Sequence, residues 1–257
     1  MIPSAPLKSR LLFALFTLFA LPGIFSAPSP LSAAEPLRVA VAANFQQPFK
    51  DVAAAFTRET GIPVEGVFTS SGSLYHQITN GAPYDAFLSA DETRPQDLFK
   101  KDLSGRPFVY ATGSVVLWAE GKKICGAANW REVMKRKDVQ KVAIANPVVA
   151  PYGAAAEAAL RSAGLWNSPD KKWIIGQTIA QAFQYTASGG ADVGFCALSS
   201  VRAAKKDGCS YDIAEAPPIL QGACLLNRTK NRAAAERFLQ FLQSPAADVI
   251  KKKYGYR

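Results

Sequence analysis

The chain has 257 residues, of which 49% are hydrophobic and 19% are charged, and its 30 Lys and Arg residues outnumber 20 Asp and Glu residues. A chain of this length and composition is typical of a globular protein with one large domain or two lobes. The basic residues are scattered and accompany no nucleic-acid motif, which argues against a nucleic acid partner and favours a solvated surface that attracts anions.

The first 34 residues predict a secretory signal peptide. Lys8 and Arg10 form a short basic segment, an apolar run follows at 11–25, and small residues at 32–34 offer a cleavage site. A transmembrane anchor is the alternative, but the apolar run is shorter than the roughly 20 residues that span a bilayer. We therefore expect cleavage near Ala34 and export to the periplasm as a soluble protein, with 28 basic residues left against 20 acidic ones.

The first part of the expected mature chain alternates strands with helices. Residues 37–45 form an apolar run typical of a buried strand, and Phe49, Val52 and Phe56 then mark one face of a helix that Gly61 closes. Further elements are predicted in chain order as a strand at 63–68, a helix at 74–81, a strand at 84–90 and a short helix after Asp91.

A long β-rich run at 106–121 differs from this pattern. It is interrupted by Gly113-Ser114, which suggests a strand that leaves one sheet and enters another. The elements expected after it are strands at 141–147, 191–198 and 221–227, and helices at 153–164, 176–190, 232–244 and 245–255. The sequence thus predicts an α/β fold with two lobes, each a mixed, mostly parallel sheet flanked by helices, and a cleft between them.

Four strand-to-helix junctions predict the ligand site, because ligands of open α/β sheets lie where strands end and helices begin. They are "AANF", "TSSGS", "NPVVAPYG" and the start of the helix after Gln177-Thr178. None of them carries Lys or Arg, and together they offer hydroxyl, amide and backbone N–H donors. Such donors suit a fully ionised tetrahedral oxyanion. For the serines of "TSSGS", ordinary helix capping is the alternative.

The chain resembles the molybdate-binding periplasmic proteins, which are the substrate-binding subunits of ABC importers. The segments that carry the resemblance are "VAVAANF", "VFTSSGSLYHQITNGAPYDAFLSAD", "VAIANPVVAPYGAAAEAAL", "GGADVGFCALSS" and "AAERFLQFLQSPAADVIKKKYGY". The resemblance covers the chain from Leu37 to Tyr256. It implies the two-lobed, type II periplasmic binding fold, with molybdate or tungstate held between the lobes by uncharged donors.

The resemblance also implies the site residues. Asn44 and Ser71 donate from lobe one, and Tyr152 and the backbone of Ile179 donate from lobe two, with Ala43 and Ser70 adding backbone N–H groups. The sequence departs from one branch of the family at Ala197, where that branch has a ligand-binding tyrosine, and Tyr152 is expected to take its place.

Further expectations follow from the same resemblance. Lobe one comprises residues 35–112 and 221–257, lobe two comprises residues 113–220, and the lobes close about Gly113-Ser114 and Gln221. The protein is expected to be a monomer without a cofactor, to hold molybdenum only as bound molybdate, and to deliver it to an ABC permease with its ATPase subunit.

Other functions are considered against the residues. An exported hydrolase is disfavoured because there is no G-x-S-x-G motif, and the only S-x-x-K match, at 168–171, contains proline. A ferric-ion receptor of this fold needs a cluster of tyrosines, and a sugar receptor needs stacked aromatic side chains with carboxylates. The junctions lack both. A sulfate or phosphate receptor stays open, because sulfate shares the shape and charge of molybdate. Asp85 and Asp91 are interpreted as capping or turn residues.

The four cysteines do not form a metal-binding pattern. Their spacing contains no CxxC, and His76 is the single histidine, so a zinc site is disfavoured. Export makes disulfides possible. Cys196 and Cys224 lie in apolar runs, where a buried free thiol is at least as good an interpretation as a bridge.

Overall fold

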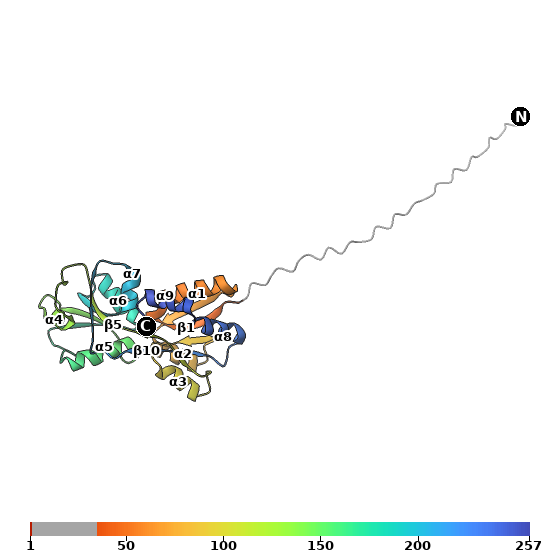
Figure 1. Cartoon of the computed structure of the whole chain (residues 1–257), viewed down its shortest axis with the longest axis horizontal. Helices are drawn as coiled ribbons and strands as arrows, with labels where there is room; N and C mark the ends of the chain where they lie inside the picture. Colours follow the sequence, from red (N-terminus) through yellow and green to blue (C-terminus); the bar gives the residue numbers. More distant parts are fainter. Residues whose placement is uncertain (2–34) are drawn as a thin grey trace. The chain divides into compact units, whose positions relative to one another are not determined.

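Two five-stranded sheets, each flanked by helices, organise the protein (Figure 1). The computed structural model describes Met1 and residues 35–257. The predicted signal peptide therefore lies outside the described residues, apart from Met1. The predicted α/β fold with two lobes is confirmed, and we call each sheet with its helices a lobe.

The first lobe is built on the sheet β2-β1-β3-β10-β4. Its strands are β1 (Leu37–Ala42), β2 (Val64–Thr69), β3 (Ala86–Leu88), β4 (Phe108–Gly113) and β10 (Ile219–Leu225). Its helices are the 3₁₀ turn η1 (Ala43–Phe45), α1 (Gln46–Thr60), α2 (Ser71–Thr79), α3 (Thr93–Lys100), α8 (Arg232–Phe241) and α9 (Pro245–Lys253).

The second lobe is built on the sheet β7-β6-β8-β5-β9. Its strands are β5 (Val115–Glu120), β6 (Lys141–Ala145), β7 (Lys172–Gly176), β8 (Val193–Ala197) and β9 (Gly208–Asp212). Its helices are α4 (Trp130–Lys135), α5 (Pro151–Ser162), α6 (Ile179–Ala187) and α7 (Leu198–Ala204). The sequence interpretation had no element for β7, β9, α4 or α7, all of which are short.

Both sheets are mixed. In the first lobe β1 pairs in parallel with β2 and β3, whereas β10 runs antiparallel to β3 and β4. In the second lobe β6 pairs in parallel with β7 and β8, whereas β5 runs antiparallel to β8 and β9. Antiparallel pairs thus equal parallel pairs, where we expected mostly parallel sheets. The reason is that the connecting strands β5 and β10 enter their sheets against the direction of the βα units.

Apolar side chains cover both faces of the first sheet. Phe49 and Phe56 of α1 pack with Phe238 of α8 on one face. On the other face Leu74 of α2 and Leu98 of α3 pack together. Burial on both faces explains why β1 is a continuous apolar run. The parallel strands β1 and β2 of this sheet end at the edge where helices begin.

The two lobes are joined by neighbouring strands. Only Ser114 separates β4 from β5, so the chain passes from one sheet into the other within one residue. It returns through β10, where Ile219 lies opposite Gly113 of β4. The two crossings therefore lie side by side, which is the arrangement expected of a hinge.

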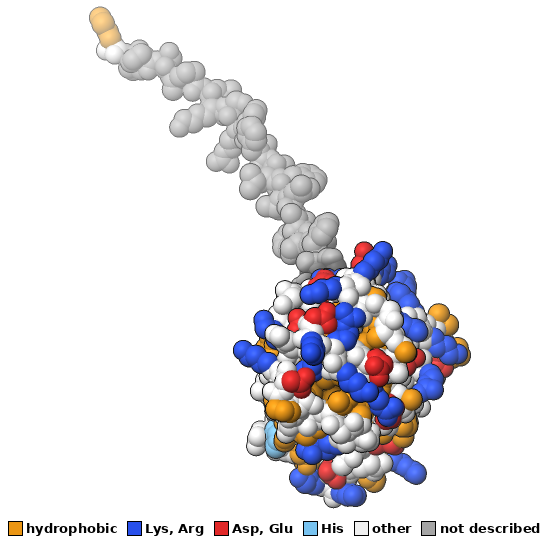
Figure 2. Space-filling model, turned by 90° about the vertical axis from the view of Figure 1, so that its left-hand side faces the viewer, with side chains coloured by type: hydrophobic (Ala, Val, Ile, Leu, Met, Phe, Trp, Pro, Cys, Tyr) orange, Lys and Arg blue, Asp and Glu red, His pale blue; other side chains and the backbone are white. Residues whose placement is uncertain are grey.

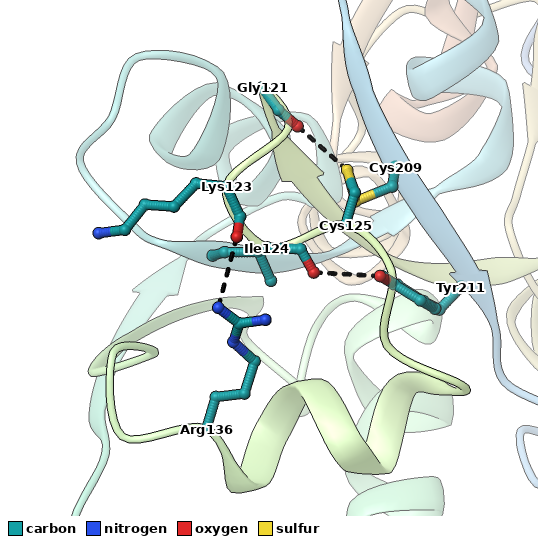
Figure 3. Close-up of a disulfide and its surroundings, with 7 residues drawn as sticks. All are labelled: Gly121, Lys123, Ile124, Cys125, Arg136, Cys209 and Tyr211. Carbon is teal, nitrogen blue, oxygen red and sulfur yellow. Dashed lines mark hydrogen bonds between the residues drawn. A yellow bond between two sulfur atoms is a disulfide. The ribbon is translucent and has the colours of Figure 1, made fainter.

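The second lobe contains a disulfide between Cys125 and Cys209, whose Cα atoms lie 5.6 Å apart (Figure 3). It ties the loop after β5 to the edge strand β9, and the Tyr211 hydroxyl of the same strand donates to the Ile124 carbonyl at 3.1 Å. Cys196 and Cys224 are buried free thiols. Burial raises the pKa of Cys224 to about 12. The sequence had left the pairing open.

Basic side chains are spread over the surface of the second lobe. Figure 2 shows Lys and Arg interleaved with acidic and apolar side chains on that face of the molecule. Several form pairs, such as Lys206 with Glu120 at 2.5 Å and Arg131 with Glu215 at 2.6 Å. Within the described residues, no helix has the length and apolar character needed to cross a membrane.

Candidate functional site

A small cavity lies where four helices begin. The first turns of η1, α2, α5 and α6 follow the ends of β1, β2, β6 and β7, two from each lobe. The cavity is lined by Ala42, Ala43, Asn44, Ser70, Ser71, Ala90, Ala150, Pro151, Tyr152 and Ile179. All six sequence-predicted site residues are among these, so the structure brings them together from four segments spread over residues 43–179. All ten lining residues are uncharged.

The cavity has the scale of a small ion. The volume open to the centre of a water-sized sphere is about 10 Å³, close to the room that one water molecule requires. Every lining residue except Pro151 is buried. A sugar or a peptide has no room in this conformation, so a ligand of only a few non-hydrogen atoms suits the cavity.

The lobes touch at the edge of this cavity. The N–H of Gly72, in the first turn of α2, donates to the carbonyl of Val149 in the other lobe at 2.9 Å. A Cβ on residue 72 would lie 3.0 Å from the backbone of Val149, which is closer than most real contacts. Gly72 therefore allows the two lobes to approach, and the structure has the character of a closed form.

Ser70 and Ser71 divide two roles between them. The Ser70 hydroxyl caps α2 by accepting from the Ser73 N–H at 3.3 Å. The Ser71 hydroxyl oxygen accepts from the Ala90 N–H at 2.9 Å, which leaves its hydrogen free to be donated. Capping and ligand binding were alternatives for this motif, and the arrangement has room for both.

Tyr152 supplies a phenol at the first turn of α5. Its side chain is 1% exposed, and its oxygen accepts from Gln221 Nε2 at 3.0 Å. Burial, followed by the neighbouring Tyr256, raises the pKa of Tyr152 well above 10. The phenol thus stays protonated at neutral pH and remains a hydrogen-bond donor.

Ile179 and Ala43 can contribute only backbone N–H groups. The Ile179 side chain packs in the core of the second lobe, while the Thr178 hydroxyl caps α6 by accepting from the Gln181 N–H at 3.1 Å. Ala43 opens η1, whose preceding residue makes no side-chain cap. N–H groups in a first helical turn have no partner within the helix and point toward its positive end.

We expected the side-chain amide of Asn44 to donate to the ligand, but in the structure it donates to other protein groups. Its Nδ2 donates to Gln221 Oε1 at 2.8 Å and to the Tyr256 hydroxyl at 2.9 Å, and it lies 3.4 Å from the Tyr152 hydroxyl. Both amide hydrogens are therefore engaged inside the protein. The backbone N–H of Asn44, in the first turn of η1, is the donor left for a ligand.

This network contains residues that the sequence interpretation did not assign to the site. Gln221 is fully buried, and its Oε1 also accepts from Tyr110 at 2.9 Å. The carbonyl of Asn44 accepts from Ser199 at 2.8 Å and from Tyr256 at 3.0 Å. A glutamine inside the apolar strand "ILQGACL" was the one available signal, and we had interpreted Gln221 only as a hinge residue.

Comparison with known proteins assigns the family. Residues 37–257 match the family described as bacterial extracellular solute-binding protein. The chain belongs to this family. Its members are binding proteins and extracellular by that description, which agrees with the expected export and with a binding role.

Individual relatives of this solute-binding protein carry more specific names. It is 40% identical over 221 residues to the molybdate-binding protein ModA of Rhodobacter capsulatus, covering 84% of this chain and 86% of that protein. It is 41% identical over 227 residues to ModA of Azotobacter vinelandii, covering 85% and 88%. The solved structure of the Azotobacter vinelandii periplasmic molybdate-binding protein superposes with a TM-score of 0.81 at 35% identity, covering 86% of this chain and 98% of that one.

The two aspartates of this solute-binding protein have structural partners. Asp85 accepts from the Arg38 N–H at 2.8 Å and from the Thr229 hydroxyl at 2.5 Å. Asp91 accepts from the Arg94 N–H at 2.9 Å and pairs with its guanidinium group. Neither lines the cavity. The described part of the chain has no group of three or more His, Cys, Asp or Glu side chains that could hold a metal ion.

Ala197 ends β8 opposite Val115 and does not line the cavity. A larger groove of about 720 Å³ lies beside the site, between α2, α3 and the segment before α5. Its walls mix apolar side chains with Asp91, Glu92 and Arg94, and only the small cavity gathers four helix N-termini. The small cavity is therefore the candidate binding site of this solute-binding protein.

Proposed function

We propose that this protein captures molybdate, and tungstate as well, as a tetrahedral dianion in the small cavity. The observation that carries the proposal is the convergence of four helix N-termini from two lobes on a cavity lined only by uncharged residues. The names of the relatives with about 40% identity point to the same ligand.

The donors divide between the lobes. Ser71 donates its hydroxyl from the first lobe, with the backbone N–H groups of Ala43 and Asn44 beside it. Tyr152 donates its phenol from the second lobe, with the backbone N–H of Ile179. Ser70, whose hydroxyl accepts in the helix cap, adds its backbone N–H. These neutral dipoles stabilise a dianion that brings no proton of its own.

Delivery requires the lobes to open and close. We place the boundaries at residues 35–112 with 221–257 for lobe one, and 113–220 for lobe two, so that Ser114 and the start of β10 form the hinge. Closure then adds Tyr152 and Ile179 to an anion held by Ser71. The closed monomer presents both lobes to an ABC permease, whose ATPase subunit drives transport, after removal of the signal peptide near Ala34.

Sulfate is the alternative ligand. A sulfate-binding protein of Mycobacterium tuberculosis has a similar structure, with a TM-score of 0.75, but its 14% identity establishes only the shared fold. Sulfate has shorter bonds to oxygen than molybdate, so a cavity that fits one anion holds the other less well. The relatives favour molybdate.

The test is calorimetric titration of the purified exported protein with molybdate, tungstate, sulfate and phosphate under identical conditions. We expect tight binding of molybdate and tungstate and much weaker binding of sulfate and phosphate. Tighter binding of sulfate, or no binding of molybdate, would show that the proposed ligand is wrong.

The site is tested by Ser71→Ala and Tyr152→Phe. Loss of one donor to a charged ligand costs about 1.5–3 kcal/mol of binding free energy, which raises the dissociation constant roughly 10- to 150-fold. Tyr84→Phe is the matched control. Tyr84 is also buried, and its hydroxyl donates to Gln77 Oε1 over 2.7 Å, but it does not line the cavity. Wild-type affinity in both site variants would refute the assignment.

A further inference from the structure

Gln221 occupies a special place in the hinge strand. The register of β10 against β4 shifts between Gln221 and Gly222, because Tyr110 is an extra residue in β4, so β4 bulges opposite Gln221. The Gln221 side chain is a fully buried amide that bonds to Asn44 of the first lobe and to Tyr152 of the second. A Cβ on Gly113, in the neighbouring strand, would lie 2.5 Å from Gln221 Nε2, so glycine leaves the space that this amide needs.

The orientation of the amide is determined by its partners. Its Oε1 accepts from the Tyr110 hydroxyl at 2.9 Å and from Asn44 Nδ2 at 2.8 Å. With two donors on the oxygen, the nitrogen must point the other way, and Nε2 donates to the Tyr152 hydroxyl at 3.0 Å.

A phenol has one hydrogen to donate and accepts through its oxygen. Because the Tyr152 oxygen accepts from Gln221, and Asn44 Nδ2 lies 3.4 Å away, its acceptor side faces the hinge network. These two donors leave the hydrogen free, and because Tyr152 also lines the cavity, an anion bound there can accept it. A phenol without these donors could rotate its hydrogen toward Gln221 or Asn44 and present lone pairs to an anion.

We propose that Gln221 is a positioning residue for anion binding: it holds the Tyr152 hydroxyl so that its hydrogen points at the ligand. This inference rests on the proposed function. Gln221 does not touch the anion, and its contribution passes through the phenol.

A double-mutant cycle separates this role from simple packing. Molybdate dissociation constants are measured by calorimetry for the wild type, Gln221→Met, Tyr152→Phe and the double variant, together with the thermal unfolding midpoint without ligand. We expect Gln221→Met to weaken binding about tenfold in the wild type, and by less than about twofold in the Tyr152→Phe protein. A purely structural role would lower the unfolding midpoint but weaken binding equally in both backgrounds.

The control pair is Gln77→Met with Tyr84→Phe, another glutamine–tyrosine hydrogen bond, 2.7 Å long and away from the cavity. We expect it to leave affinity unchanged. Should Gln221→Met not fold, Gln221→Leu replaces it. Its side chain cannot donate to the phenol oxygen, so we expect a similar loss of about tenfold.

The outcomes distinguish the two proposals. If Tyr152→Phe weakens binding but Gln221→Met acts equally in both backgrounds, or if Gln221→Leu binds as the wild type does, the positioning role is wrong and the proposed function stands. If the wild-type protein does not bind molybdate, the proposed function itself fails.

Discussion

Gly113 illustrates how one residue controls the geometry of the site. The nearest neighbours of a Cβ built on this residue are the Tyr152 hydroxyl and Gln221 Nε2, both within the buried network. The backbone of β4 has to pass this close because the chain crosses to the other lobe one residue later. At this position glycine is required for close approach and not for an unusual backbone angle.

We predict that Gly113→Ala weakens molybdate binding by more than about tenfold, because the methyl group displaces the Tyr152 phenol and a donor to a charged ligand is worth about 1.5–3 kcal/mol. Calorimetry checks the affinity. Gly105→Ala is the control, since a Cβ there would have its nearest neighbour at 3.9 Å, an ordinary contact, and should bind normally. Equal affinities of the two variants would contradict the close packing inferred here.

At the scale of elements, helix N-termini supply the binding groups and a disulfide stabilises a loop far from them. The loop after β5 is tied to β9 by Cys125 and Cys209, which are 84 residues apart in sequence. Neither cysteine lines the cavity. The bond should therefore affect the stability of the second lobe and leave the binding site unchanged.

We predict that replacing both Cys125 and Cys209 by Ala lowers the free energy of unfolding by about 2–4 kcal/mol, because the unfolded chain loses a long-range constraint. Urea denaturation with and without reductant measures this. The double variant should be insensitive to reductant, whereas the wild type should lose a similar amount when reduced. Molybdate affinity should not change, and a large change would show that this loop is coupled to the site.

At the scale of the whole molecule, three buried tyrosines connect the lobes. Tyr110, Tyr152 and Tyr256 are each 4% exposed or less. Burial is the largest cause that raises the pKa of each above its usual value of 10. Below pH 10 both the folded and the unfolded chain keep these protons. Above pH 10 the unfolded chain releases protons that the folded chain retains, so stability falls as pH rises.

We predict that the free energy of unfolding declines above pH 10 by up to about 1.4 kcal/mol per pH unit for each of these tyrosines. Urea denaturation between pH 8 and pH 11.5 measures the slope. In Tyr152→Phe the part of the slope due to the three groups should be reduced by about a third. An unchanged slope would mean that the phenol of Tyr152 does not retain its proton in the folded protein.

The sequence by itself determined the local features. Helical periodicity placed Phe49, Val52 and Phe56 on the buried face of α1, and continuous apolar runs marked β1 and β6. These patterns can be read because they depend on neighbours within one element. The junction residues could be named for the same reason, since strands that end beside helix N-termini meet at one edge of a sheet.

Only the tertiary structure decided which partners these residues have. The amide of Asn44 reaches Gln221 and Tyr256, which are 177 and 212 residues away, and so it turns into the hinge network. The same holds for the pairing of Cys125 with Cys209 and for the antiparallel entry of β5 and β10. Such contacts depend on how distant segments pack together in three dimensions, and no pattern within a single segment encodes that packing.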